Sequence, residues 1–294
     1  MKSFLILISI LISFSYGLFL GVYQLPPFKQ ISNAKNLFTA KVSDIELNKF
    51  NQCNLPKTSK VESNSHAFIG HAYGSVNDSN IYDFISLNTQ NFIGQHSDKL
   101  KTIIFTGDVF SVPSIKKWEL LRETVGLNTD IYVAPGNHDV VRPDSLDVFK
   151  MSEFGQQQYP FIKYLDGTPV IIDDSVISNW EVSNSTIDFV NKVESSEVII
   201  ARHNMPVVDL ISLANGNSYK SNKLESVEQF VRKFDKDKSF YWIVGDSGAF
   251  EELPRMSCLI FENHTFFING LGQVSGDSLI LYNESTFSEF VISS

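Results

Sequence analysis

Four short apolar runs in this chain each end in a polar motif. The runs cover residues 102–105, 131–134, 198–201 and 240–244. The motifs that follow them are Gly107-Asp108, Gly136-Asn137-His138-Asp139, Arg202-His203-Asn204 and Gly245-Asp246-Ser247-Gly248. Short apolar runs bounded by turn residues predict strands that are buried on both faces. Ligands of open α/β sheets bind beyond the carboxyl ends of such strands, so these Asp, Asn and His side chains predict a metal site.

The rest of the apolar pattern predicts helices between these strands. Ser114 is a plausible N-cap for a helix whose apolar stripe is Ile115, Trp118, Leu121 and Val125. Similar stripes predict helices near 81–92 (capped by Asp78 or Ser79), 187–193, 207–214 and 224–234. Further strands are expected at 67–69, 169–172, 258–261, 264–268, 279–282 and 287–292. Alternating strands and helices followed by consecutive strands predict a mixed α/β sandwich.

The amino terminus carries a long apolar stretch. Residues 4–23 contain no charge, and Pro26-Pro27 would end a helix there. This length is enough to span a bilayer, so residues 1–24 are expected to be a signal anchor. Cleavage as a signal peptide after Gly17 and a buried helix stay open as alternatives. The two export interpretations predict either a single-pass membrane protein with an extracytoplasmic domain or a secreted protein. A polar linker is expected at 25–64, with one short helix near 44–50, and a folded domain at 65–294.

The amino-acid composition further limits the classes of protein to which this chain could belong. Hydrophobic residues make up 43% of the chain and aromatic residues 13%, which is enough for a large core. The net charge of −9 argues against binding to a nucleic-acid backbone. Cys53 and Cys258 are the only cysteines, and their number alone leaves a disulfide open.

The order of the four motifs resembles the calcineurin-like metallophosphoesterase family over roughly residues 65–290. Gly136-Asn137-His138-Asp139 after a buried strand is the most specific element of the resemblance. The resemblance implies a four-layer αββα sandwich, in which two stacked mixed sheets lie between helices. It also implies two metal ions, commonly Mn, Fe or Zn, at the strand ends, and hydrolysis of a phosphate ester by metal-activated hydroxide.

The resemblance implies a role for each matching residue. Asp108 matches the carboxylate that bridges both metals, and Asn137 and His203 match ligands of one of them. His138 matches the catalytic histidine beside the phosphate, and Asp139 matches the carboxylate that orients it. These residue types suit the chemistry, because carboxylate, amide oxygen and neutral imidazole all bind such ions.

Two motifs depart from the family pattern. His71 and Tyr73 stand where the family has Asp-x-His, and Gly245-Asp246-Ser247-Gly248 stands where it has Gly-His-x-His. His71 and Asp246 can each serve as a ligand, Tyr73 is a weaker candidate, and Gly248 offers no side chain. We therefore expect a remodelled centre with one strong and one weak position, holding one or two ions.

The substrate is expected to be a phosphorylated small molecule or a glycan-type compound. Arg202 and Tyr73 are candidate substrate-binding residues. Arg202 would clamp a phosphate oxygen, although neighbouring strand residues point to opposite faces. The alternative function is a catalytically weak relative that binds a phosphorylated or sugar ligand. A serine hydrolase with Ser247 as nucleophile and His264 as base is a third possibility. Otherwise His264 and His96 are expected at the surface or in loops, and His66 is expected to be structural.

Overall fold

The computed structural model describes residues 13–17, 47–74, 84–141, 144–213, 224–247, 255–272 and 276–292. The chain divides into two compact units, Met1–Ser43 and Asp44–Ser294. In the first unit, residues 13–17 are helical. Within the described ranges, none of the helices combines the length and the apolar character that crossing a membrane requires. Most of the apolar stretch 4–23 lies outside the described residues.

The second unit contains a seven-stranded sheet in the order β1-β10-β11-β9-β8-β7-β6. Its strands are β1 (Asn51–Gln52), β6 (Phe161–Leu165), β7 (Thr168–Ile172), β8 (Glu197–Arg202), β9 (Ser239–Val244), β10 (Met256–Phe261) and β11 (His264–Asn269). The central strands β7, β8, β9 and β11 pair in parallel, and β6, β10 and β1 pair antiparallel at the two edges. The carboxyl ends of the central strands therefore meet at one rim.

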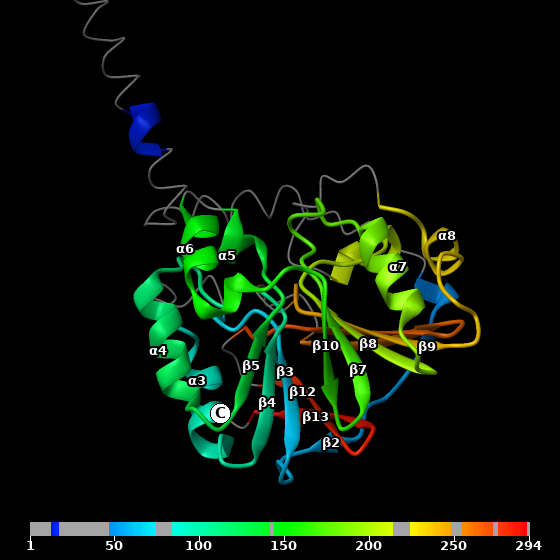
Figure 1. The fold of residues 1–294 in the computed structure, drawn as a ribbon, viewed down its shortest axis with the longest axis horizontal. Coiled ribbons are helices and arrows are strands. Elements are labelled where there is room, and N and C mark those ends of the chain that lie inside the picture. The colour runs from blue at the N-terminus through cyan, green and yellow to red at the C-terminus, as the bar shows by residue number, and fades with distance from the viewer. Residues whose placement is uncertain are drawn as a thin grey trace, which may run out of the picture. The chain divides into compact units, whose positions relative to one another are not determined.

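A six-stranded sheet follows the order β2-β13-β12-β3-β4-β5 (Figure 1). Its strands are β2 (Lys57–Thr58), β3 (Ser65–Ile69), β4 (Leu100–Phe105), β5 (Asp130–Val133), β12 (Ser278–Asn283) and β13 (Thr286–Val291). Strands β3, β4 and β5 pair in parallel, so their carboxyl ends also share a rim. Both sheets are mixed, as the sequence predicts, and the strands predicted before all four motifs are present.

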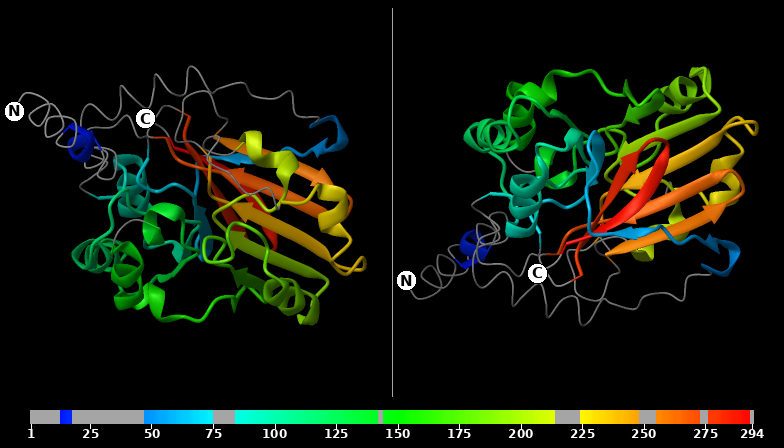
Figure 2. Two further views of the ribbon diagram at one scale, coloured as in Figure 1. Left: turned by 90° about the horizontal axis from the view of Figure 1, so that it is seen from above. Right: turned by 90° about the horizontal axis from the view of Figure 1, so that it is seen from below.

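Helices lie on both sides of the pair of sheets (Figure 2). On one side are α3 (Leu87–His96), α4 (Ile115–Val125), α5 (Asn137–Val140), α6 (Ser145–Met151) and the 3₁₀ helix η2 (Glu153–Gln156). On the other are α7 (Asn184–Lys192), α8 (Val227–Val231) and the 3₁₀ helices η1 (Leu47–Lys49) and η3 (Val208–Leu213). The predicted cap of α4 is confirmed, since Ser114 Oγ accepts a hydrogen bond from the Lys117 amide.

Three hydrophobic clusters separate these layers. The first joins α3, α4 and α6 to the smaller sheet through residues such as Trp118 and Phe105. The second joins α7 and α8 to the larger sheet through residues such as Trp242. The third contains Phe68 and Ile199 and fills the space between the sheets. Burial on both sheet faces accounts for the continuous apolar runs, and the architecture is an α/β sandwich with two mixed sheets.

Several element boundaries differ from those predicted. The fold begins before residue 65, because β1 and β2 add to the two sheets and a disulfide joins Cys53 to Cys258. Helix α3 starts at Leu87 with Ser86 as its N-cap, whereas Asp78, Ser79 and Ile81 lie outside the described residues. No helix or strand is predicted between residues 142 and 168, where the structure contains α6, η2 and β6.

Candidate metal centre

The centre is assembled from the carboxyl ends of strands in both sheets. Asp108 follows β4, and Asn137 begins α5 directly after β5 in the smaller sheet. His203 follows β8, and Asp246 follows β9 in the larger sheet. The two rims meet here, so each sheet supplies two candidate ligands. The structure thus brings together four residues that the sequence analysis selected from separate motifs.

The four candidate ligands are centred on the side-chain nitrogen Nε2 of His203. It lies 3.2 Å from Asn137 Oδ1, 3.5 Å from Asp108 Oδ1 and 3.7 Å from Asp246 Oδ1. His203 is fully buried, and both carboxylates are at least 96% buried. Three acceptor oxygens therefore surround one imidazole nitrogen away from bulk water.

This arrangement favours positive charge beside His203. Its other ring nitrogen, Nδ1, lies 3.0 Å from the Thr106 carbonyl, which can only accept, so Nδ1 carries a proton. Burial opposes charge on the ring, but Asp108 and Asp246 outweigh it and raise the pKa of His203. A metal cation at Nε2 could be shared by the three surrounding oxygens, whereas a proton there would be donated to one of them.

The spacing of the donors fits a small cation with modest adjustment. Two ligands about 2.1 Å from one ion lie about 3.0–3.4 Å apart at octahedral or tetrahedral angles. The distance between His203 and Asn137 is in this range, and the two carboxylate distances exceed it by a few tenths of an ångström. Among the described residues, no group of three His, Cys, Asp or Glu side chains forms a ready metal site, although Asp108, His203 and Asp246 are of these types. These three side chains would therefore have to move closer together to share one ion.

His71 stands on the other side of Asp108. Its Nε2 lies 3.7 Å from Asp108 Oδ2, and its Nδ1 is buried without a hydrogen-bond partner among the described residues. Burial lowers the pKa of His71 to about 4. The ring is therefore neutral at physiological pH, which is the form that binds metal.

Backbone strain coincides with this pair. His71 has a φ of 52° and Asp108 a φ of 53°, in the left-handed region that residues with side chains disfavour. Burial opposes ionisation of Asp108, but His203, His138 and His71 together lower its pKa. Strain of this kind concentrates at functional sites, because surrounding structure must enforce it.

Tyr73 and His138 form a pair next to His71. The Tyr73 ring centroid lies 4.3 Å from that of His71, and its hydroxyl oxygen lies 3.4 Å from His138 Nε2. His138 Nδ1 lies 3.2 Å from the Ser111 carbonyl, which fixes the ring, and the His138 amide donates to Asp108 Oδ1 at 2.9 Å. Tyr73 is buried and His138 is half-buried, so His138 is the more accessible of the two.

Asp139 binds the backbone of two neighbouring loops. Its carboxylate accepts hydrogen bonds from the amides of Val109, Phe110 and Gly136, at 2.9 to 3.4 Å. Burial and the charge of Asp108 raise its pKa to about 7. Asp139 thus fixes the loop that carries Asp108 against the turn that carries His138. The expected task of orienting the imidazole falls to the Ser111 carbonyl.

Two glycines allow the loops to approach this closely. A Cβ on Gly107, whose φ is +84°, would lie 2.5 Å from Cγ and Nδ1 of His203. A Cβ on Gly136 would overlap the backbone nitrogen and Oδ1 of Asp108. Glycine is therefore required at both positions for the candidate ligands to hold their places.

Asp246 is held by Asn204, which Ser175 holds in turn. Asn204 is part of the third motif, but neither of these two roles was predicted. Asn204 Nδ2 donates to Asp246 Oδ2 at 3.3 Å, and Ser175 Oγ contacts both Oδ1 and the amide of Asn204 at 3.0 Å. Ser175 belongs to the polar run 173–175 that directly follows β7. That run carries the same signal of polar residues at a strand end that selected the other motifs.

Arg202 has buried structural partners. It is fully buried, its Nη1 lies 3.1 Å from Asp173 Oδ2, and its Nε donates to the Asn204 carbonyl at 2.8 Å. Its Nη2 also donates to the carbonyls of Trp180 and Glu181. These contacts connect β8 to the segment after β7, so we assign Arg202 a structural role in place of the phosphate clamp considered above.

The expectation that His264 lies at the surface is wrong. His264 is fully buried in β11, where its Nδ1 accepts a hydrogen bond from Trp242 Nε1 at 2.9 Å. It pairs with Phe240 near the start of β9, whereas Ser247 lies beyond the other end of that strand. At about 3.3 Å per residue, residues 240–244 alone separate them by about 13 Å. A Ser247–His264 catalytic pair is therefore excluded.

No protein-family model matches the chain, and no curated protein shows significant similarity to it.

Proposed function

We propose that this protein is a metal-dependent phosphoesterase of the calcineurin-like type with an altered metal centre. The observation that carries the proposal is the convergence of Asp108, Asn137 and Asp246 on His203 Nε2, at distances of 3.2 to 3.7 Å. Two buried carboxylates, an amide oxygen and an imidazole form a donor set that suits Mn, Fe or Zn. Two further features support the proposal. The helices and the two sheets can be interpreted as four layers, as in this family, and the turn at Asp108 is strained.

Asp108, Asn137, His203 and Asp246 would hold the stronger cation position. His71 and Asp108 would form the weaker one. A bound ion would polarise a phosphoryl oxygen and lower the pKa of a ligated water. The protein would hold the ester between the carboxyl ends of the two sheets, where the candidate ligands are shielded from bulk water.

His138 is the group placed to act on the ester itself. Its ring is half-buried, and Ser111 holds Nδ1, so Nε2 faces the Tyr73 hydroxyl. A phosphate ester next to Asp108 would meet His138 Nε2 and the Tyr73 hydroxyl first. Because Nδ1 donates to the Ser111 carbonyl, His138 would act as the imidazolium, which is protonated at Nε2 as well, and would donate a hydrogen bond to a phosphoryl oxygen or a proton to the leaving oxygen.

Metal content and turnover together test this proposal. Elemental analysis of the purified full chain should give one tightly held ion per chain, and an aryl phosphate or diester should be hydrolysed in a chelator-sensitive way. His138→Ala should abolish turnover and leave the metal content unchanged. Asp108→Asn should lose the metal. Normal hydrolysis by His138→Ala, or unchanged metal content in Asp108→Asn, would contradict the assigned roles.

One observation favours the alternative of a catalytically weak binding protein. Tyr73 stands where the family pattern has a histidine, and it packs on His71 and contacts His138, so the second cation position would lack that ligand. A protein that binds a phosphorylated or sugar ligand without hydrolysing it would show ligand-dependent stabilisation and no chelator-sensitive turnover. The same pair of assays therefore separates the two functions.

A further inference from the structure

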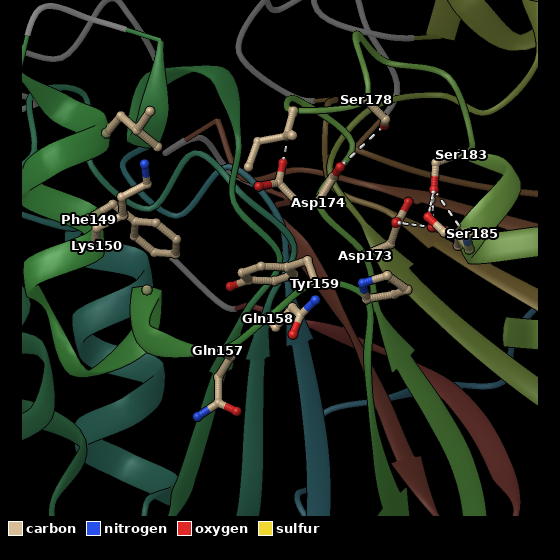
Figure 3. A pocket seen from close by; sticks show the side chains of 15 residues that line it. Phe149, Lys150, Gln157, Gln158, Tyr159, Asp173, Asp174, Ser178, Ser183 and Ser185 are labelled. Carbon is tan, nitrogen blue, oxygen red and sulfur yellow. Dashed lines mark hydrogen bonds between the residues drawn. The ribbon is translucent and has the colours of Figure 1, made fainter.

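A cleft of about 400 Å³ lies beside the candidate centre, between α6 with η2 on one side and the residues preceding and starting α7 on the other (Figure 3). Its volume is in the ordinary range for sites that bind small molecules. Figure 3 shows Tyr159 and Asp174 between Phe149 and Lys150 on one wall and Ser183 on the other. The cleft contains none of the candidate metal ligands.

Two residues of the cleft are linked to the centre through their neighbours. Asp174 precedes Ser175, whose hydroxyl holds Asn204, and Asn204 in turn donates to Asp246. The Tyr159 hydroxyl donates to the carbonyl of Val133 at 2.7 Å, at the end of β5 and shortly before Gly136. The cleft therefore occupies the same rim of the sandwich as the centre.

The buried carboxylate of Asp174 gives the cleft a directed acceptor. Its Oδ1 accepts the amides of Val176 and Ile177, each at 3.0 Å, and this fixes the side chain. The residue is 95% buried, and burial raises its pKa to about 6. A hydroxyl donor from a ligand would offset the cost of desolvating this group.

The remaining lining residues are neutral or apolar for the most part. Gln157 and Gln158 offer exposed amides that can donate and accept, and the half-buried ring of Tyr159 offers apolar surface, whereas Phe149 is buried. Lys150 is the sole Lys or Arg among the described lining residues, and Asp174 opposes it, whereas Asp173 is paired with Arg202. This balance disfavours a second phosphate or another anionic group, which would require a cationic site.

We propose that this cleft binds the leaving group of the ester, and that this group is a neutral polyhydroxylated ring of the sugar type. Amides and a carboxylate match ring hydroxyls, and the aromatic ring of Tyr159 matches the C–H face of such a ring. The assignment of the ring as a leaving group rests on the proposed function. Binding of the ring can be tested without any catalysis.

The first experiment measures binding of methyl glucoside to the full chain by saturation-transfer NMR titration, with cyclohexanol and uridine as comparison ligands. Methyl glucoside should bind more tightly than either. Gln158→Ala removes one amide from the cleft and should weaken binding about fivefold, the loss expected for one hydrogen bond. Gln156→Ala changes an exposed glutamine two residues away, outside the cleft, and should leave binding unchanged. Absence of glucoside binding, tighter binding of uridine, or equal effects of the two variants would overturn the proposal.

The second experiment compares kcat/KM for glucose 1-phosphate and cyclohexyl phosphate. The sugar ester should be preferred about tenfold or more, as two hydrogen bonds would give, and Gln158→Ala should reduce the preference about fivefold. Equal kcat/KM values for the two esters would overturn the leaving-group assignment. If neither ester is hydrolysed but methyl glucoside binds as expected, the proposed function fails and the sugar-binding cleft stands.

Discussion

Replacing Gly107 by alanine tests whether the backbone of this loop positions His203. The φ of +84° at Gly107 costs a residue with a side chain about 1–2 kcal/mol. The new Cβ would also lie 2.5 Å from His203 Cγ, where ordinary contact begins at 3.4 Å, so the ring must move by about 0.9 Å. Overpacking of this kind adds about 1–3 kcal/mol in a buried site. The expected loss of unfolding free energy is about 2–5 kcal/mol.

Gly167→Ala is the matched control for this variant. Gly167 has a φ of +90°, but nothing lies within 4 Å of its added Cβ. It should therefore lose only the backbone contribution of about 1–2 kcal/mol. Denaturant unfolding without added metal measures both variants, and metal titration should show about 10- to 100-fold weaker binding for Gly107→Ala alone. Equal unfolding free energies, or unchanged metal affinity in Gly107→Ala, would refute the assigned packing of His203 on this loop.

Three further predictions concern groups around the site and the core. Burial lowers the pKa of His264 from 6.5 to about 3, so its contribution to stability is complete above pH 6.5 and decreases as the pH falls towards 3. Denaturant unfolding across that range should show a slope from this group of up to about 1.4 kcal/mol per pH unit, and an equal slope in His264→Phe would contradict the assignment. The Cys53–Cys258 disulfide spans a sequence separation of 205 residues, so its loss should cost about 5 kcal/mol; thermal unfolding with and without reductant measures this, and the double serine variant should be insensitive to reductant. Ser175→Ala should release Asn204 and weaken metal binding several-fold at a stability cost of about 1–3 kcal/mol; Ser152→Ala, which also removes a buried hydroxyl, should leave metal affinity unchanged in the same titration.

The elements that could be predicted from the sequence are those with local signals. Helix α4 has a serine cap and an apolar stripe within 12 residues, and both features are found in the structure. The buried strands before the four motifs are continuous apolar runs that end in turn residues, so their position and burial were both predictable. The convergence of Asp108 and His203 follows from the rule that ligands gather at strand ends.

The features that escaped prediction depend on contacts distant in sequence. Strand β1 is two polar residues, and its pairing with Leu259 and Ile260 lies next to the disulfide between Cys53 and Cys258, which are distant in sequence. The burial of His264 depends on the indole of Trp242, 22 residues away. The roles of Ser175 and Asn204 appear only when β7, β8 and β9 lie side by side.

The fold has two halves, each made of one sheet and its helices. The close approach of Gly70 and Gly245 sets how near the two sheets come to each other at their rims. A Cβ on Gly70 would lie 2.6 Å from the Gly245 Cα, so here the rims of the two sheets touch backbone to backbone. Asp108 and Asn137 belong to the half that contains β4 and β5, and His203 and Asp246 belong to the half that contains β8 and β9. The stronger cation position proposed above therefore needs both halves. An ion bound between the two halves would hold them together. Its affinity would therefore increase with the fraction of molecules in which the two halves have docked during folding.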